Sequence, residues 1–155
     1  MSFQIHALPA APYRALFQLS DAELAARNMH RSVVADCPGT PCRVSMTDAK
    51  VGERVILLNY QHQPAHSPYQ ATHAIFVREN AEHADLQPGE VPQVIRTRLM
   101  SVRLFDCDDI MVDADVVDGA DVAASLIDAF DNPQIAYVHL HNAKPGCFAA
   151  LVTRN

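Results

Sequence analysis

The stretch "YVHLHNAKPGCFAALVTR", residues 137–154, decides the fold of this chain. Successive side chains of a strand point to opposite faces, so Tyr137, His139 and His141 share one face. Val138 and Leu140 share the other face, which we expect to pack inward. The Lys-Pro-Gly corner after these residues ends one strand and begins the next. The stretch therefore predicts an antiparallel β-hairpin with an aliphatic face and a face that carries two imidazoles.

The length of the hairpin loop decides on which face Cys147 lies. An even loop places Asn142 opposite Cys147 and puts the thiol on the face of Val138 and Leu140. An odd loop places Cys147 opposite His141, and only this geometry allows a Cys–His pair. A thiolate at neutral pH needs such a cation or a helix N-terminus beside it. The sequence leaves both alternatives open.

The segments upstream of the hairpin show the patterns of further strands and two helices. Period-two or continuous apolar runs between turn signals predict strands at 3–8, 31–36, 42–45, 53–60, 73–79, 93–106 and 110–117. Residues 61–69 hold two prolines and are predicted to be an irregular excursion. We expect an α+β fold, a mostly antiparallel sheet of about seven strands with two helices, in a single domain over residues 1–155.

Both helices have recognisable start signals. Ser20 and Glu23 have capping-box spacing, which predicts a helix that begins there and ends near Asn28. The second helix is "DGADVAASLIDAFDN", residues 118–132, with Asp118 as its predicted N-cap. Its apolar residues recur at helical spacing and form one predicted stripe: Val122, Ala123, Leu126, Ile127 and Phe130.

Composition excludes several classes of protein. Apolar residues make up 49% of the 155, which suits a folded domain with a core. The net charge is −6 and Trp is absent, so the basic and aromatic surface of a nucleic-acid binder is not expected. No apolar run is long enough to span a membrane, and no signal peptide is recognised. We expect a cytoplasmic protein with four reduced cysteines: Cys37, Cys42, Cys107 and Cys147.

Five blocks, in this order, resemble a known family: "PGTPCR", "SPYQATHAIFVRE", "RLMSVRLFD", "MVDADVVDG" and "YVHLHNAKPGCFAALVTR". They are similar to the uncharacterised bacterial domain of unknown function 1203 (DUF1203). The resemblance covers nearly the whole chain and implies a single-domain soluble protein. It implies no reaction, ligand or catalytic residue. Some relatives have a Cys-x-x-Cys where this chain has Ser45, which disfavours a metal site at that position.

The candidate site joins polar residues from segments that are far apart in the sequence. His139, His141 and Cys147 are the candidate catalytic residues, because imidazoles transfer protons near neutral pH and a thiolate is a nucleophile. The predicted ligand-binding residues are Arg43, His73, Tyr69 and Arg103. An arginine at a strand end can bind a carboxylate or phosphate, although pairing with the chain's own acids is the simpler interpretation. Tyr69 is a candidate pocket lip.

A metal site is an alternative built from other combinations of the same residue types. Four residues separate Cys37 from Cys42, and His73, His139 or His141 could complete a tetrahedral set. His62 and His66 have helical spacing, but Pro64 between them excludes an unbroken helix, so both are predicted to be loop histidines. The acidic stretch at 106–121 does not match a calcium loop, because Val117 occupies the fifth position, where an acidic or amide residue is required. We therefore predict no bound metal and no cofactor.

These observations favour a protein that binds a small, anionic ligand in a pocket lined by His and Arg, with catalysis left open. Two alternatives remain at this point. One is a non-catalytic module that forms a homodimer through an edge strand. The other is a protein that binds a metal ion through His and Cys.

Overall fold

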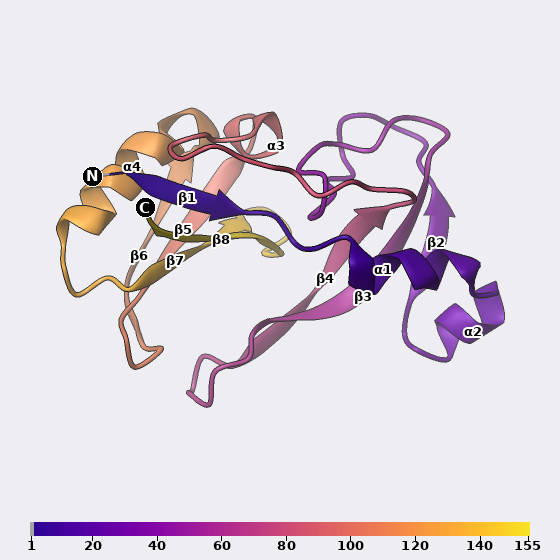
Figure 1. Cartoon of the computed structure of the whole chain (residues 1–155), viewed down its shortest axis with the longest axis horizontal. Coiled ribbons are helices and arrows are strands. Elements are labelled where there is room, and N and C mark those ends of the chain that lie inside the picture. Colours follow the sequence, from indigo (N-terminus) through magenta and orange to yellow (C-terminus); the bar gives the residue numbers. More distant parts are fainter. Residues whose placement is uncertain (1) are drawn as a thin grey trace.

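The computed structural model describes residues 2–155, and within this range the chain forms eight strands in two antiparallel sheets. The five-stranded sheet has the order β1-β8-β7-β5-β6 and the three-stranded sheet the order β2-β3-β4. The sheets lie side by side along the long axis, and both termini are at the end that holds the five-stranded sheet (Figure 1). The strand bounds are β1 (Phe3–His6), β2 (His30–Val33), β3 (Arg54–Gln63), β4 (Ala71–Arg78), β5 (Leu99–Phe105), β6 (Met111–Asp118), β7 (Tyr137–Asn142) and β8 (Phe148–Arg154).

The helices are short, apart from one that packs on the five-stranded sheet. Both reciprocal bonds of the predicted capping box are present at Ser20 and Glu23, which confirms the start of α2. Asp118 accepts a hydrogen bond from the Ala120 amide and caps the turn that leads into α4. The helix bounds are α1 (Ala11–Arg14), η1 (Ala15–Gln18), α2 (Asp21–Ala25), α3 (Gln93–Arg96), η2 (Gly119–Asp121) and α4 (Val122–Asp131).

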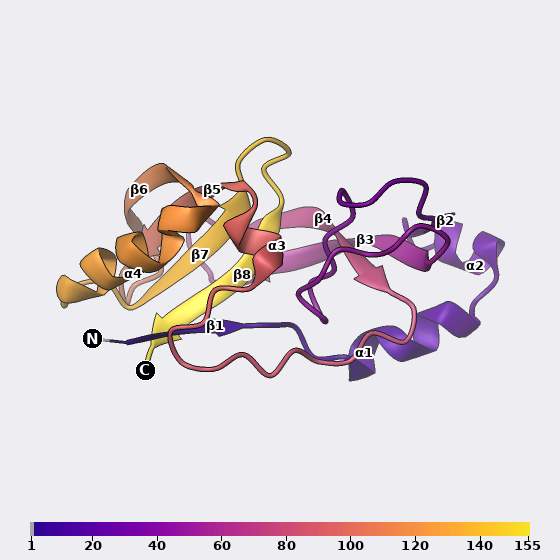
Figure 2. The same cartoon turned by 90° about the horizontal axis from the view of Figure 1, so that it is seen from above.

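The aliphatic face of the terminal hairpin forms the main core. Val138 and Leu140 are fully buried and belong to one cluster with Leu126 and Phe130 of α4. This confirms the predicted inward face and places α4 against it (Figure 2). Burial of these side chains is the principal stabilising contribution on this side of the sheet. Ile127 of the predicted helical stripe is instead 41% exposed.

The hairpin loop is even, and a β-bulge follows it in β8. The Asn142 amide donates to the Cys147 carbonyl (2.9 Å), and Phe148 is the register partner of His141. The register shifts between His141 and Leu140, which pairs with Ala150. A bulge re-aims side chains, and here the Phe148 ring lies on the histidine face.

The far end of the β3–β4 hairpin covers the histidine face of the five-stranded sheet. The Tyr60 ring lies 5.6 Å from the Phe148 ring, and the Tyr69 ring lies 5.9 Å from the Phe105 ring. Gln63 Nε2 donates to the Tyr137 hydroxyl at 2.8 Å. The polar face of the terminal hairpin is thus a contact surface between the two sheets.

Two predicted strands are wrong. Residues 42–45 form a turn with only isolated bridges, from Pro41 to Asp48 and from Cys42 to Phe76, because no neighbouring strand continues the ladder. Residues 93–106 do not form one strand: α3 occupies the beginning, and β5 starts at Leu99. Pro92 takes the N-cap position there.

Within residues 2–155, no helix combines the length and the hydropathy that crossing a bilayer requires.

Candidate functional site

Three histidines from two sheets meet at the contact between the sheets. His62 is near the end of β3, and His139 and His141 lie on β7. Each ring offers one nitrogen, and these three nitrogens all lie within 4.8 Å of one another. We call these residues the histidine triad. The Phe148 ring stacks on the His62 ring with centroids 5.4 Å apart and an interplanar angle of 6°.

Each ring of the triad has a buried nitrogen without a hydrogen-bond partner. His141 Nδ1 is 3.0 Å from the Gly146 carbonyl oxygen, which can only accept, so Nδ1 carries the proton and Nε2 keeps its lone pair. This Nε2, together with Nδ1 of His62 and of His139, is buried without a protein partner. Within residues 2–155 four buried side-chain nitrogens are in this state, and three of them belong to the triad. Buried polar atoms are nearly always paired, so this concentration calls for an explanation.

The triad is uncharged near neutral pH. Burial lowers the pKa of His62 to about 4, and the positive charge of Arg103 adds to this shift. Burial also lowers the pKa of His139 to about 4, with His62 and Arg103 as further causes. The pKa of His141 falls to about 3, mainly through burial, although the Gly146 carbonyl opposes the change. Neutral imidazoles are the form that binds metal ions and accepts protons.

A groove gives solvent access to one side of the triad. His62 and His139 line it together with Gln63, Tyr137 and Asp109. The Tyr137 hydroxyl donates to the Asp109 carboxylate (2.7 Å) and accepts from Gln63, which fixes this rim.

Arg103 lies on the same face of the five-stranded sheet as the triad. It is the register partner of His139 across the β5–β7 ladder. Its Nε donates to the Ser101 hydroxyl at 3.2 Å, and within residues 2–155 no carboxylate forms an ion pair with it. A cation thus stands beside three neutral rings.

A second site lies on the other side of the terminal hairpin, between the loop at 39–48, β4 and the hairpin tip. It is a pocket of about 560 Å³, a volume typical of small-molecule sites. We call it the hairpin pocket. Much of its wall is apolar and comes from Leu57, Ala74, Phe76, Leu99 and Pro145.

The charged residues of the hairpin pocket are all basic. Arg43, Arg98 and Lys144 line it together with His73, and no Asp or Glu is among its lining residues in the described part of the chain. Arg98 is neutralised by Asp48, with Nη2 and Oδ1 2.6 Å apart. Lys144 is exposed at the rim. The net charge of the chain is −6, so the charged residues that line this pocket have the opposite sign to the chain as a whole.

Arg43 is buried, and its side-chain partner within residues 2–155 is the sulfur of Cys147. Its side chain is 2% exposed, and its Nη2 donates to the Cys147 sulfur at 2.9 Å. Nε and Nη1 donate to the carbonyl oxygens of Phe148 and Pro41. Burial lowers the pKa of Arg43, whereas Cys147 acts to raise it. Asn142 Nδ2 also donates to this sulfur (3.4 Å), so two side-chain donors contact it.

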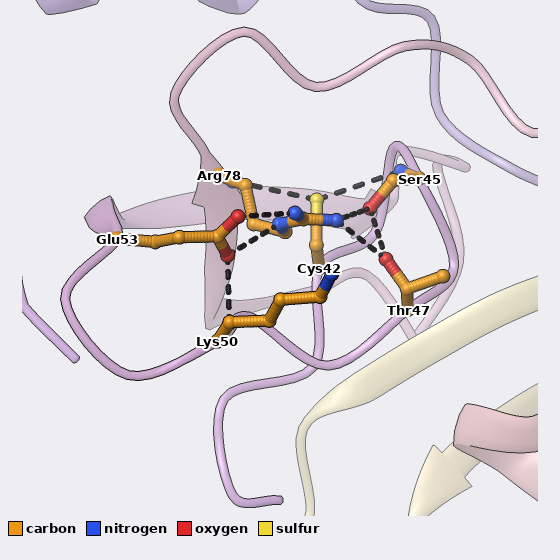
Figure 3. Close-up of polar contacts among 6 residues, drawn as sticks. All are labelled: Cys42, Ser45, Thr47, Lys50, Glu53 and Arg78. Atoms are coloured by element: carbon orange, nitrogen blue, oxygen red, sulfur yellow. Dashed lines mark hydrogen bonds and ion pairs between the residues drawn. The ribbon is translucent and has the colours of Figure 1, made fainter. Parts of the chain in front are cut away.

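Hydrogen bonds of Arg78, which lies on β4, hold the loop that carries Arg43 against the three-stranded sheet. Figure 3 shows the Arg78 guanidinium between Glu53 and the hydroxyl of Thr47, to which Nη1 donates at 2.7 Å. The Arg78 backbone amide donates to the sulfur of Cys42, the residue before Arg43 (3.4 Å). These contacts fix the loop, and with it one wall of the hairpin pocket.

The structure divides the predicted site residues between these two places. Arg43, His73 and Cys147 line the hairpin pocket. His139, His141 and Arg103 lie on the opposite face of the hairpin, and the Tyr69 ring reaches that side through Phe105. Because the loop is even, Cys147 faces Asn142 and forms no pair with His141. The expected cavity shared by Arg43 and the two histidines is therefore absent from residues 2–155.

Sequence reasoning missed His62, which was predicted to lie in a loop. The strand β3 continues through His62 to Gln63, because Pro64 ends the strand and does not interrupt it. Side chains alternate along a strand, so an extended strand would have placed His62 on the same face as Leu58 and Tyr60. This pattern could have identified His62 as a site residue. Cys37 is exposed and Cys42 is buried near Arg78, so neither contributes to the triad.

Comparison with known proteins identifies a family and no function. Residues 39–154 match the family described as "Protein of unknown function (DUF1203)". No curated protein matches the chain, and no solved structure does.

Proposed function

We propose that this chain, which belongs to the DUF1203 family, binds a small molecule with an anionic head group and an apolar body in the hairpin pocket. The observation that carries the proposal is the positive charge of the residues that line the pocket. Every charged group among its lining residues is basic, in a chain that is acidic overall. Such a pocket attracts anions and repels cations.

Two basic groups are available to the head group. Lys144 forms no ion pair within residues 2–155 and stands at the rim. Each terminal nitrogen of Arg43 carries a second N–H beyond those bonded to Pro41 and Cys147. The head group would lie near these donors, and the apolar body would cover Leu57, Phe76 and Leu99.

Cys147 is the group in the pocket that could react with a ligand. Its sulfur lines the pocket and accepts hydrogen bonds from Arg43 and Asn142, so it lies within reach of a bound ligand. Binding is the function proposed, and attack by this sulfur on an electrophilic ligand is the chemistry that the site could add.

The test uses 8-anilinonaphthalene-1-sulfonate, whose fluorescence reports transfer of an aromatic anion into an apolar site. We expect saturable binding of one probe per chain, weakened by salt. Lys144→Ala removes an exposed cation worth up to about 1 kcal/mol, or about a fivefold loss of affinity. Lys50→Ala is the matched control, because this exposed lysine lies outside the pocket.

Leu99→Glu gives a stronger test. Leu99 is 45% exposed, so the substitution leaves the core intact while it places a carboxylate in the pocket wall. We expect probe binding to be lost. The proposal fails if Leu99→Glu binds like the wild type, or if Lys50→Ala weakens binding as much as Lys144→Ala does. Native mass spectrometry of the purified protein offers a second readout, since a captured ligand should be missing from Leu99→Glu.

A further inference from the structure

We infer that the histidine triad binds a divalent first-row transition metal ion, for which zinc is the best match. This site is separate from the hairpin pocket and lies on the opposite face of the terminal hairpin. Its ligands are one ring nitrogen each from His62, His139 and His141.

The first support is the state of the three buried nitrogens. Each imidazole holds a nitrogen with no protein partner, and all three rings are 9% exposed or less. A hydrophobic cluster would not require three adjacent unpaired polar atoms, because Phe or Leu would fill the same space without them. A metal ion takes up three lone pairs at once and explains the whole set.

The second support is the orientation of His141. A metal-bound histidine usually donates its other ring N–H to a backbone carbonyl or carboxylate, which fixes the ring and the tautomer. His141 does so, because Nδ1 bonds to the Gly146 carbonyl while Nε2 turns into the triad. Gly146 belongs to the hairpin loop, so the corner of the hairpin fixes the orientation of this ligand.

The third support is the donor set and its surroundings. Imidazole nitrogens suit zinc and its neighbours in the first transition row, whereas calcium and magnesium require oxygen ligands. Three protein ligands with one solvent-accessible side are typical of a zinc site that keeps an open position. The groove beside His62 and His139 supplies that side.

The unpaired cation beside the triad fits a ligand at the open position. Arg103 lacks a carboxylate partner within residues 2–155 and shares the face of His139. An anion bound to the metal would also neutralise this guanidinium. We therefore expect small anions to bind to the metal-loaded protein more tightly than to the metal-free protein.

The rings must close slightly around an ion. Nitrogens bound to zinc at about 2.0–2.1 Å in a tetrahedron are about 3.4 Å apart. The triad nitrogens lie within 4.8 Å of one another, so small rotations about the side-chain bonds bring them to this spacing.

The experiment titrates the chelator-treated full chain with CoCl2, because tetrahedral cobalt(II) has intense visible absorption bands and zinc displaces it. We expect one cobalt ion per chain and loss of the bands when ZnCl2 is added. His62→Gln and His141→Gln should each weaken binding more than about 100-fold, beyond the effect of losing an outer-shell partner. His66→Gln is the matched control, since this exposed histidine precedes β4 in the same hairpin and lies outside the triad.

A second measurement keeps the inference falsifiable if the triad variants do not fold. X-ray absorption of the zinc-loaded wild-type protein should show about three imidazole ligands at about 2.0 Å and no sulfur. The inference is overturned if the wild type binds no cobalt, if folded triad variants bind it unchanged, or if sulfur ligands are found. None of these results bears on binding of the fluorescent probe in the hairpin pocket.

Discussion

Acid should destabilise the metal-free protein well before its carboxylates are protonated. The pKa values of His62, His139 and His141 lie at about 4, 4 and 3 in the folded chain, below the ordinary value of 6.5. As the pH falls below about 6.5, the unfolded chain binds protons that the folded chain excludes. The free energy of unfolding must therefore decrease on acidification, and these three histidines leave it unchanged well above this range.

The size of the effect follows from the three shifts. Between about pH 7 and pH 5, a histidine whose pKa drops from 6.5 to about 4 costs about 2 kcal/mol of stability. His141 contributes about the same amount, because at pH 5 its pKa of about 3 keeps the folded ring neutral, whereas the unfolded ring, with a pKa of 6.5, is protonated. The three rings together give about 4–6 kcal/mol, a large share of the roughly 5–15 kcal/mol that holds a domain folded.

Carboxylates contribute little to the change in the free energy of unfolding between about pH 7 and pH 5. Hydrogen bonds from Ser20 lower the pKa of Glu23, and the Arg78 guanidinium lowers that of Glu53. Their stabilisation is present above the ordinary pKa of 4.5 and is lost below it. A loss of stability between about pH 7 and pH 5 thus reports mainly on histidines.

The assay is urea unfolding followed by circular dichroism in the presence of a chelator, at about pH 7, 6 and 5. His139→Gln should remove about a third of the pH-dependent change, while His66→Gln should leave it unaltered. A free energy of unfolding that stays level or rises on acidification would show that the triad is not buried in the neutral form, and the reasoning would be refuted.

Three further predictions concern stability and are measured by urea or thermal unfolding. Leu126→Ala should cost about 2–5 kcal/mol because the side chain is fully buried, whereas Ile127→Ala, at a 41% exposed position, should cost under about 1 kcal/mol; equal costs would contradict the placement of α4. Gly119→Ala should lower the melting temperature sharply, since its Cβ would overlap the Ile95 carbonyl oxygen, and an unchanged melting temperature would disprove this close approach. Ser20→Ala should cost about 1 kcal/mol and speed amide exchange in α2, and wild-type exchange rates would count against the cap.

Features that depend on neighbouring residues were predictable from sequence. The capping box at Ser20 is local, and so is the turn at the Lys-Pro-Gly corner. The alternation that puts His139 and His141 on one face is a property of any strand. These predictions needed no knowledge of the partner segments, and the structure confirms them.

Features that depend on distant partners were not predictable. The loop at residues 42–45 has the apolar content of a strand but finds no ladder to join. Arg43 and Cys147 are 104 residues apart, and their contact arises from the packing of the loop against the hairpin. His62 joins the other two histidines only because the β3–β4 hairpin crosses to the second sheet, which no local pattern records.

Phe148 makes the two proposed sites separable by genetics. Its ring stacks on His62, while its carbonyl oxygen, which any amino acid would provide, accepts the bond from Arg43. Replacing the ring by leucine therefore perturbs one neighbourhood and preserves the main-chain anchor of the other. An effect of Phe148→Leu can thus be assigned to the histidine triad, whereas a function that survives the substitution can be assigned to the hairpin pocket.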